Sequence, residues 1–359
     1  MNMNKSLTAV AVAGALAVPM SAAQAQPEGW YGFIAAGIES SDIDREAPDA
    51  GDPGSGPAAI FHTNAGADGE GGTGLADIAA SRFGWGGSED LGNGLEANYQ
   101  FEWGTDSTTA AAIGNRLSNV GLSGGFGSIT LGQQWSALYN YMGWNVFRSV
   151  GHGGGAWYYH TSNFQNIAAF GLRSSNTIDY TFGAGPYGDD PFTFTVQAVS
   201  NSNVYTTTGG SDDDFFLDGL SLGFQGTAGI VTWNAFYGQE EASGDRTPQI
   251  YGLGGRLDLG PALVSATFLQ SDWDMSGVND EPNSIHVNGE MDFGGGISGR
   301  VMVATVDGDD VMDDIDANLF VGLEQALSSR TFIDFEFETI DYDNTGDESV
   351  VYLGARHTF

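Results

Sequence analysis

The amino-acid sequence predicts an all-β protein whose strands close into a transmembrane barrel. Three patterns support this fold class. Apolar and polar residues alternate in segment after segment, many segments are near ten residues long, and tight turns alternate with longer polar loops. Alternation with period two turns one face of a strand toward an apolar environment and the other toward water. About ten residues is the length that a tilted strand needs to cross a bilayer core.

The alternation is clearest in two segments. In residues 93–104, apolar residues fall on one face of the predicted strand, and polar residues, including Glu96 and Glu102, fall on the other. Residues 328–341 show the same alternation, with Glu336 on the polar face. Charged side chains in alternating positions are too frequent for a packed soluble interior, so the polar face is predicted to line a water-filled lumen. Sixteen strands are predicted, at about 29–38, 77–88, 93–104, 115–125, 127–134, 171–183, 191–200, 215–225, 228–239, 249–258, 261–271, 282–292, 297–307, 314–325, 328–341 and 347–359.

The N-terminus is typical of a secretory signal peptide. Lys5 precedes an apolar run, and the small residues Ala23 and Ala25 form a cleavage pattern. We therefore expect residues 1–25 to be a signal peptide that is removed on export. Residues 26–359 are then expected to form a single barrel domain.

The composition excludes several classes of function. The chain has 46 acidic and 11 basic residues and a net charge of −35, which repels nucleic acid. Such a surface also stays hydrated at high salt, as in the acidic proteome of a halophilic organism. The chain has no cysteine, which excludes disulfides, thiolate metal sites and a cysteine nucleophile.

Four passages resemble Gram-negative general porins. They are "SRFGWGGSEDLGNGLEANYQFEW" from Ser81, "NRLSNVGLSGGFGSITLGQQW" from Asn115, "LRSSNTIDYTF" from Leu172 and the final "YLGARHTF". The resemblance implies a sixteen-stranded antiparallel barrel that forms a homotrimer in the outer membrane and lets small hydrophilic solutes and ions diffuse through. It also implies contact with outer-membrane lipid and lipopolysaccharide. The terminal Phe359 resembles the signal that the barrel-assembly machinery reads.

The resemblance further implies an inward-folded constriction loop after the fifth strand, at about residues 136–170. In such porins, arginines on the wall face this loop, and Arg82, Arg116 and Arg173 occupy the matching positions. Arg148, within the loop, is a fourth candidate for the pore constriction. The alternative for Arg148 is a solvent-facing loop tip.

The chain departs from the family pattern in its charges. Residues 107–178 contain no Asp or Glu, although the constriction loop of general porins carries carboxylates. Gln133 and Phe33 replace two residues that are basic in the family. Arginines beside a neutral loop predict a weak anion preference at high salt, because salt near ~1 M has a Debye length of about 3 Å and screens the acidic loops at the mouth.

Two alternatives remain open from the sequence. One is a substrate-specific outer-membrane channel with an aromatic-lined loop. The other is a secreted soluble calcium-binding β-protein or adhesin. The aromatic candidates for the first alternative are Trp144, Phe147, Trp157, Tyr158 and Tyr159.

Neither a catalytic residue set nor a cofactor motif is predicted. The histidines lack metal-ligand spacing, and Ser284 and His286 are expected on the same strand. The chain is therefore interpreted as a channel and not an enzyme. Acidic outer loops such as 341–349 could hold loosely bound Ca²⁺ or Mg²⁺, with solvated turns as the alternative.

Overall fold

The structure, a computed structural model, describes residues 29–45, 71–109, 113–146, 151–161, 171–186, 188, 190–200, 218–241, 247–273, 281–308 and 313–359. The predicted signal peptide, residues 1–25, lies outside this part of the chain. The described strands are β1 (Gly29–Arg45), β2 (Gly71–Ala76), β3 (Arg82–Gly92), β4 (Leu95–Gly104), β5 (Gly114–Gly124), β6 (Gly127–Trp135), β7 (Arg173–Phe182), β8 (Phe192–Val199), β9 (Gly219–Ala228), β10 (Val231–Glu240), β11 (Gln249–Asp258), β12 (Ala262–Asp272), β13 (Asn283–Gly294), β14 (Ile297–Asp307), β15 (Ile315–Ala326), β16 (Thr331–Tyr342) and β17 (Gly346–Thr358).

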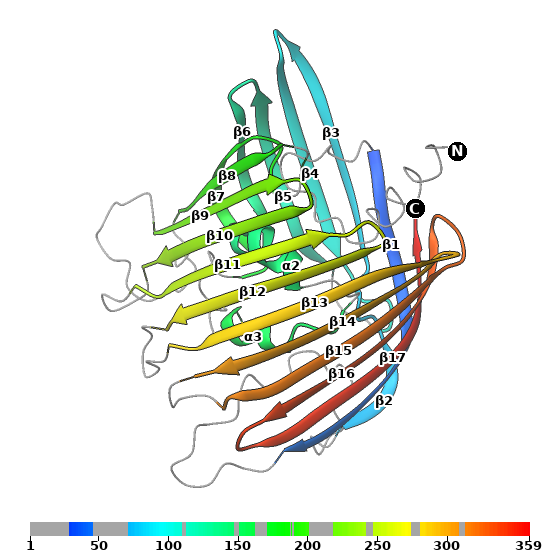
Figure 1. The fold of residues 1–359 in the computed structure, drawn as a ribbon. Coiled ribbons are helices and arrows are strands. Elements are labelled where there is room, and N and C mark those ends of the chain that lie inside the picture. The colour runs from blue at the N-terminus through cyan, green and yellow to red at the C-terminus, as the bar shows by residue number, and fades with distance from the viewer. Residues whose placement is uncertain are drawn as a thin grey trace, which may run out of the picture.

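The strands form a closed antiparallel barrel (Figure 1). Each strand from β3 onward pairs with the next one along the chain, and β17 pairs with β1 from Phe33↔Thr358 to Arg45↔Gly346. The other edge of β1 pairs with β3 near its start and with β2 farther along. Because β2 and β3 share one place in the ring, the barrel has sixteen strand places, which confirms the predicted fold class.

The second strand place differs from the single strand predicted at 77–88. Residues 77–81 leave the ladder between β2 and β3. There the Ser81 hydroxyl accepts the Ala35 N–H at 2.9 Å, and the Asp77 carboxylate accepts the Ser81 N–H at 3.2 Å. Side-chain hydrogen bonds of this kind replace ladder bonds locally, and period-two alternation cannot reveal them.

The first strand is longer than the predicted 29–38. It continues to Arg45 because β17 pairs with it along its whole second half. Residues 41–45, which lie beyond the predicted strand, are therefore part of the wall.

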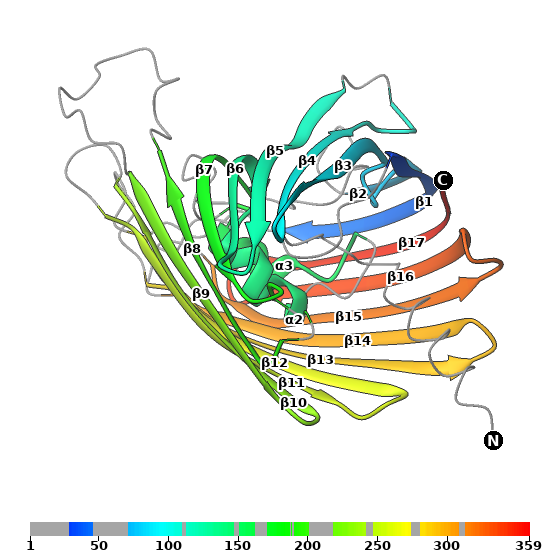
Figure 2. The ribbon, with the colours of Figure 1, turned by 90° about the horizontal axis from the view of Figure 1, so that it is seen from above.

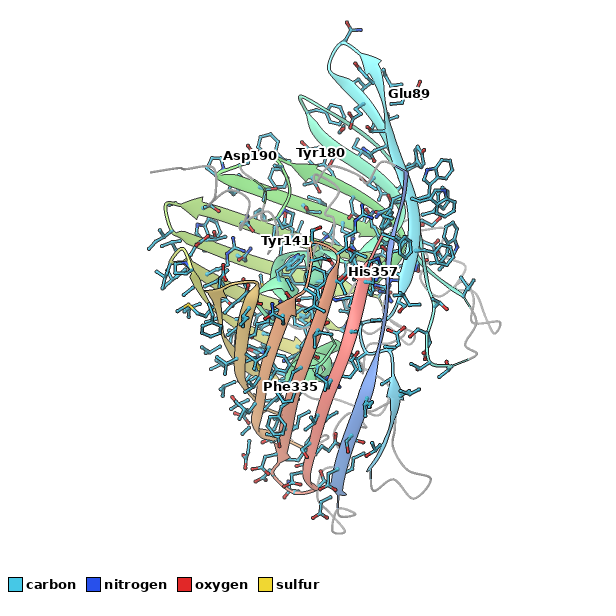
Figure 3. The ribbon with its side chains drawn as sticks, turned by 90° about the vertical axis from the view of Figure 1, so that its right-hand side faces the viewer. Glu89, Tyr141, Tyr180, Asp190, Phe335 and His357 are labelled. Atoms are coloured by element: carbon cyan, nitrogen blue, oxygen red, sulfur yellow. The ribbon has the colours of Figure 1, made fainter. Side chains whose placement is uncertain are left out.

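The two faces of the wall differ as the alternation predicts. On β16, Asp334, Glu336 and Glu338 are buried on the inner face, while the outer face carries the intervening apolar residues. Phe335 is one of these outer residues (Figure 3). Large apolar side chains elsewhere on the outer face are exposed, such as Leu253 at 64%. Exposed apolar residues around a ring of strands are the expected surface of a barrel in lipid.

An inner segment, residues 136–146 and 151–161, follows β6 and lies within the ring of strands (Figure 2). It contains the π-helical turn η1 (Tyr139–Gly143) and the short helices α2 (Trp144–Val146) and α3 (Gly155–Thr161). η1 contacts β9 to β11, α2 contacts β11 to β13, and α3 contacts β12 to β15. None of the helices among the described residues is long and apolar enough to span a membrane.

The described apolar core lies between the inner segment and the wall. Leu138, Tyr141, Met142 and Trp157 from the segment are fully buried there against strands from β8 to β16. Gly223 on β9 makes the approach of η1 feasible, because a Cβ at this position would overlap the Tyr141 ring. The segment is thus packed like a protein core on one wall of the barrel.

Candidate functional site

Three arginines meet on one side of the inner wall, on β3, β5 and β7. Arg116 Nε donates a hydrogen bond to Glu102 Oε1 at 2.8 Å, and a terminal nitrogen of Arg82 lies 3.9 Å from the same oxygen. The guanidinium carbons of Arg116 and Arg173 lie 5.8 Å and 5.4 Å from the centre of the Trp135 ring. The structure thus brings together the three arginines that the resemblance selected. We call this group, with Glu102 and Trp135, the arginine site.

Tyr139 lies at the arginine site. Its ring stacks on Trp135 with 4.7 Å between centroids, and the Trp144 ring lies 6.4 Å from it. Burial raises the pKa of Tyr139, although the three nearby positive charges act to lower it. Tyr139 therefore offers a neutral hydroxyl beside the guanidinium groups. No motif distinguishes Trp135 or Tyr139 in the sequence, apart from their place where the fifth predicted strand ends.

Arg82 is fixed by the irregular backbone between β2 and β3. Its side chain donates to the carbonyl oxygens of Ala79 at 3.0 Å and Ala80 at 3.2 Å. Its guanidinium carbon lies 4.6 Å from the centre of the Phe33 ring. The Phe33 ring on the paired strand β1 thus supports Arg82.

A second charged group lies farther around the inner wall, on β14 to β17. Arg356 contacts Glu324 at 2.7 Å and Asp334 at 3.4 Å, and Arg300 lies 3.8 Å from Glu324. Two arginines and two carboxylates balance each other here. Sequence reasoning missed both arginines, because Arg300 lies outside the family motifs and Arg356 was considered only as part of the terminal strand.

The tip of the inner segment, residues 151–155, binds carboxylates of the wall. His152 Nδ1 lies 3.0 Å from Glu336 Oε2, and His152 Nε2 lies 3.3 Å from Glu39 Oε2. The backbone N–H groups of Gly151 and His152 also donate to Glu336, at 3.2 Å and 3.0 Å. Burial lowers the pKa of His152, but its hydrogen bonds with Glu336 and Glu39 raise it to about 10. His152 is therefore a cation at neutral pH.

Glu338, the next inward residue of β16, extends this contact. It accepts the backbone N–H groups of Gly153 at 2.8 Å and Gly155 at 3.3 Å. Asn318 on β15 donates to the same carboxylate at 2.8 Å and accepts the Ala156 N–H at 3.2 Å. Backbone amides, which no sequence motif displays, supply much of the binding here.

Asn145 and His160 also hold the inner segment to the wall. Asn145 in α2 donates to Asn234 at 3.2 Å, and its carbonyl oxygen accepts hydrogen bonds from Ser265 at 2.9 Å and Asn288 at 2.6 Å. These partners come from β10, β12 and β13. The helix α2 is thereby tied to three strands at once.

His160 in α3 makes the other connection. Its ring nitrogens lie 2.7 Å from the hydroxyls of Ser271 and Ser284, and Ser284 also lies 2.9 Å from His286 Nε2. Burial, together with His286, lowers the pKa of His160 to about 3, so the ring is neutral. The two serines and two histidines are enclosed, with at most 1% of each exposed. This enclosed group fits a structural link better than a reactive serine.

The remaining constriction candidates have different positions. The Trp144 side chain is partly exposed, whereas Trp157 is fully buried in the core and presents no surface to the lumen. The backbone of Tyr158 and Tyr159 is part of α3, but their side chains are not among those described. Phe147 and Arg148 lie outside the described residues.

The acidic turn after β16 is organised by protein groups. Asp313 is buried and accepts hydrogen bonds from the backbone and side-chain nitrogens of Asn344 at 2.9 Å and 3.1 Å. In the described part of the chain, no cluster of His, Asp and Glu has a geometry that could hold a metal ion. The suggested Ca²⁺ or Mg²⁺ binding thus has no described ligand set to support it.

The C-terminal Phe359 continues the pairing that closes the barrel. Its backbone N–H donates to the carbonyl oxygen of Gly32 on β1 at 3.0 Å, and its side chain is 54% exposed. Its predicted role as an assembly signal stays a prediction.

Several known proteins are similar to this chain in sequence. The major outer membrane protein P.IB of Neisseria meningitidis serogroup B is 39% identical over 142 residues, which are 38% of this chain and 35% of that protein. Outer membrane porin protein 32 of Delftia acidovorans is 30% identical over 126 residues, which are 34% of this chain and 36% of that protein. The chain thus matches only about a third of the length of these relatives.

Solved structures show the same fold over nearly the whole chain. An anion-selective porin from Comamonas acidovorans superposes with a TM-score of 0.73 at 19% identity, covering 93% of this chain and 100% of that one. A trimeric form of OmpT from Vibrio cholerae gives a TM-score of 0.64 at 15% identity, covering 93% and 100%. The sequence model of the Gram-negative porin family matches residues 8–345, and the chain belongs to this family.

Proposed function

We propose that the protein is an outer-membrane channel through which small hydrophilic solutes and ions diffuse passively. The closed barrel with polar residues on its inner face carries this proposal. The inner segment crosses the ring from β6 to β16 and would narrow the water-filled passage as a constriction loop.

We further propose a weak preference for anions at high salt. At the arginine site, Arg82 and Arg116 share one carboxylate, Glu102, and Arg173 lies beside them at Trp135, whereas two arginines meet two carboxylates in the second group. Positive charge at a narrow passage favours anions, and it acts more strongly there than on an open surface. The similarity to an anion-selective porin supports the same choice.

Planar-bilayer recording of the purified protein tests both statements. We expect stepwise single-channel currents and, in a salt gradient around 1 M, a reversal potential of the sign that anion permeation gives. No channels at all would contradict the first proposal. A clear cation preference at high salt would contradict the second and leave the first intact.

A substrate-specific channel is the second candidate, and one observation favours it. Trp135, Tyr139 and Trp144 form a continuous aromatic row beside the arginine site. Such a row would suit an aromatic or sugar solute. Block of the current by one solute at micromolar to millimolar concentration would support this candidate. The third expectation, a soluble calcium-binding protein or adhesin, is not proposed, because the chain belongs to the porin family.

We propose a homotrimer in the outer membrane as the working assembly, with outer-membrane lipid and lipopolysaccharide around it. The trimeric form of the similar OmpT supports this proposal. Export through residues 1–25 and insertion by the barrel-assembly machinery through Phe359 belong to the same proposal.

A further inference from the structure

The wall carries a buried acidic patch where the tip of the inner segment lies. The patch consists of Glu39 on β1 and Glu336 and Glu338 on β16, whose exposed fractions are 0%, 2% and 4%. Buried carboxylates are costly unless hydrogen bonds or opposite charges compensate them. The partners of the patch therefore decide how much of its charge acts on the lumen.

The inner segment supplies a positive group and a set of amide donors to this patch. The imidazole of His152 lies between Glu336 and Glu39, and four backbone amides of residues 151–155 point at Glu336 and Glu338. Successive amides that converge on an anion spread and stabilise its charge. We call His152 with these amides the latch. On β17, between the two strands of the patch, the Tyr352 ring lies 6.2 Å from that of His152.

The glycines of the latch fit the space beside the wall, where a larger residue would collide with its neighbours. Gly153 has φ of +83°, and a Cβ there would lie 2.8 Å from the Phe320 ring. A Cβ at Gly155 would overlap Ile340. A carboxylate in the tip would face the three buried carboxylates of the patch, which gives a physical reason for the absence of Asp and Glu from residues 151–155.

We infer that the latch determines the ion selectivity of the channel, because it masks the acidic patch and holds the inner segment against the wall. This inference rests on the proposed channel function. With the latch closed, the imidazolium offsets one of the three negative charges of the patch and the amides stabilise the others, so the patch opposes the arginine site less. With the latch open, three carboxylates face the permeating ions, and the released tip enters the lumen.

Two variants break the same contact in opposite electrical senses. His152→Gln removes a positive charge, and Glu336→Gln removes a negative one. We expect His152→Gln to shift the anion-to-cation permeability ratio toward cations, and Glu336→Gln toward anions, each by about two- to threefold. Both variants weaken the hold on the tip, although its hydrogen bonds to Glu338 remain, so both should raise the frequency of brief closures at least about twofold.

The double variant separates charge from geometry. In His152→Gln/Glu336→Gln the charges compensate, so the reversal potential should return to the wild-type value while the added closures persist. His357→Gln and Glu89→Gln are matched controls, because both side chains are exposed and remote from the latch. Both controls should behave as wild type does. Hydrogen exchange of the amides at 151–155, measured on folded protein in detergent, should be faster in both single variants.

The outcomes distinguish this inference from the proposed function. Wild-type protein that forms no channels overturns the proposed function and this inference together. Wild-type channels, with single variants that keep the wild-type reversal potential and closure frequency, overturn the inference alone. Unchanged amide exchange in both single variants also overturns it, since the latch would then not hold the tip.

Discussion

At the scale of single residues, Glu102 sets the net charge of the arginine site. It is the carboxylate that both Arg116 and Arg82 approach, and it is 5% exposed. Glu102→Gln is expected to increase the anion-to-cation permeability ratio by about two- to threefold, because it removes a negative charge from a passage of low effective dielectric constant. Reversal potentials in a fixed salt gradient check this. Glu96→Gln, an exposed position on the same face of β4, should change the ratio less.

Because of His152, the stability of the protein is expected to fall with rising pH in the alkaline range. Its pKa lies at about 10 in the folded protein, above the ordinary 6.5, because Glu336 and Glu39 stabilise the imidazolium despite burial. A raised pKa contributes stability that is complete below 6.5 and is lost as the pH rises through about 10. Glu338 and Tyr352 are further titratable groups near the ring.

Thermal unfolding in detergent at a series of pH values tests this dependence. The midpoint temperature of the wild type should fall between pH 8 and pH 11. His152→Gln should start lower and lose less over the same interval. Parallel curves for the two proteins would contradict a role of His152 in this pH range.

At the scale of the elements, Gly153 couples the path of the inner segment to the wall. Gly153→Ala should destabilise the protein by about 1 to 3 kcal/mol more than Gly260→Ala. Both glycines have positive φ, but only at Gly153 would a Cβ meet a neighbour, the Phe320 ring. Chemical unfolding of both variants measures the difference. An equal loss would show that the contact with Phe320 is unimportant.

The strands were predictable from sequence because their signal is local. Alternation over ten residues located every place in the ring. Errors arose where a side chain interrupts the pairing, as at Ser81, and where a neighbouring strand prolongs it, as β17 does up to Arg45. The arginine site was predictable in part, since Arg82, Arg116 and Arg173 lie in recognisable strands. The latch was not, because it joins Glu39, the tip and Glu336 across most of the chain, and because backbone amides leave no mark in a sequence.

At the scale of the whole molecule, two sets of charges compete over different distances. The net charge of −35 attracts cations to the mouth, whereas the arginine site acts within the passage. Exposed charges are screened once the Debye length falls from about 10 Å at 0.1 M salt to about 3 Å at 1 M. The permeability ratio is therefore expected to shift toward anions as salt rises at a constant gradient. Reversal potentials at both concentrations check this, and a shift toward cations would contradict it.

The pairing of β1 with β17 has a consequence for how the chain could be rewired. Since Phe359 is hydrogen-bonded to Gly32, a short linker could join Phe359 to Gly29, and new termini could open in the exposed turn at 259–261. The ring of strands would be unchanged, so such a circular permutant should refold in detergent. In cells the permutant would lack a terminal Phe359, and we expect poor insertion into the membrane. Appending the final residues of the last strand should restore insertion. Folding and recognition by the assembly machinery would then depend on separate parts of the sequence.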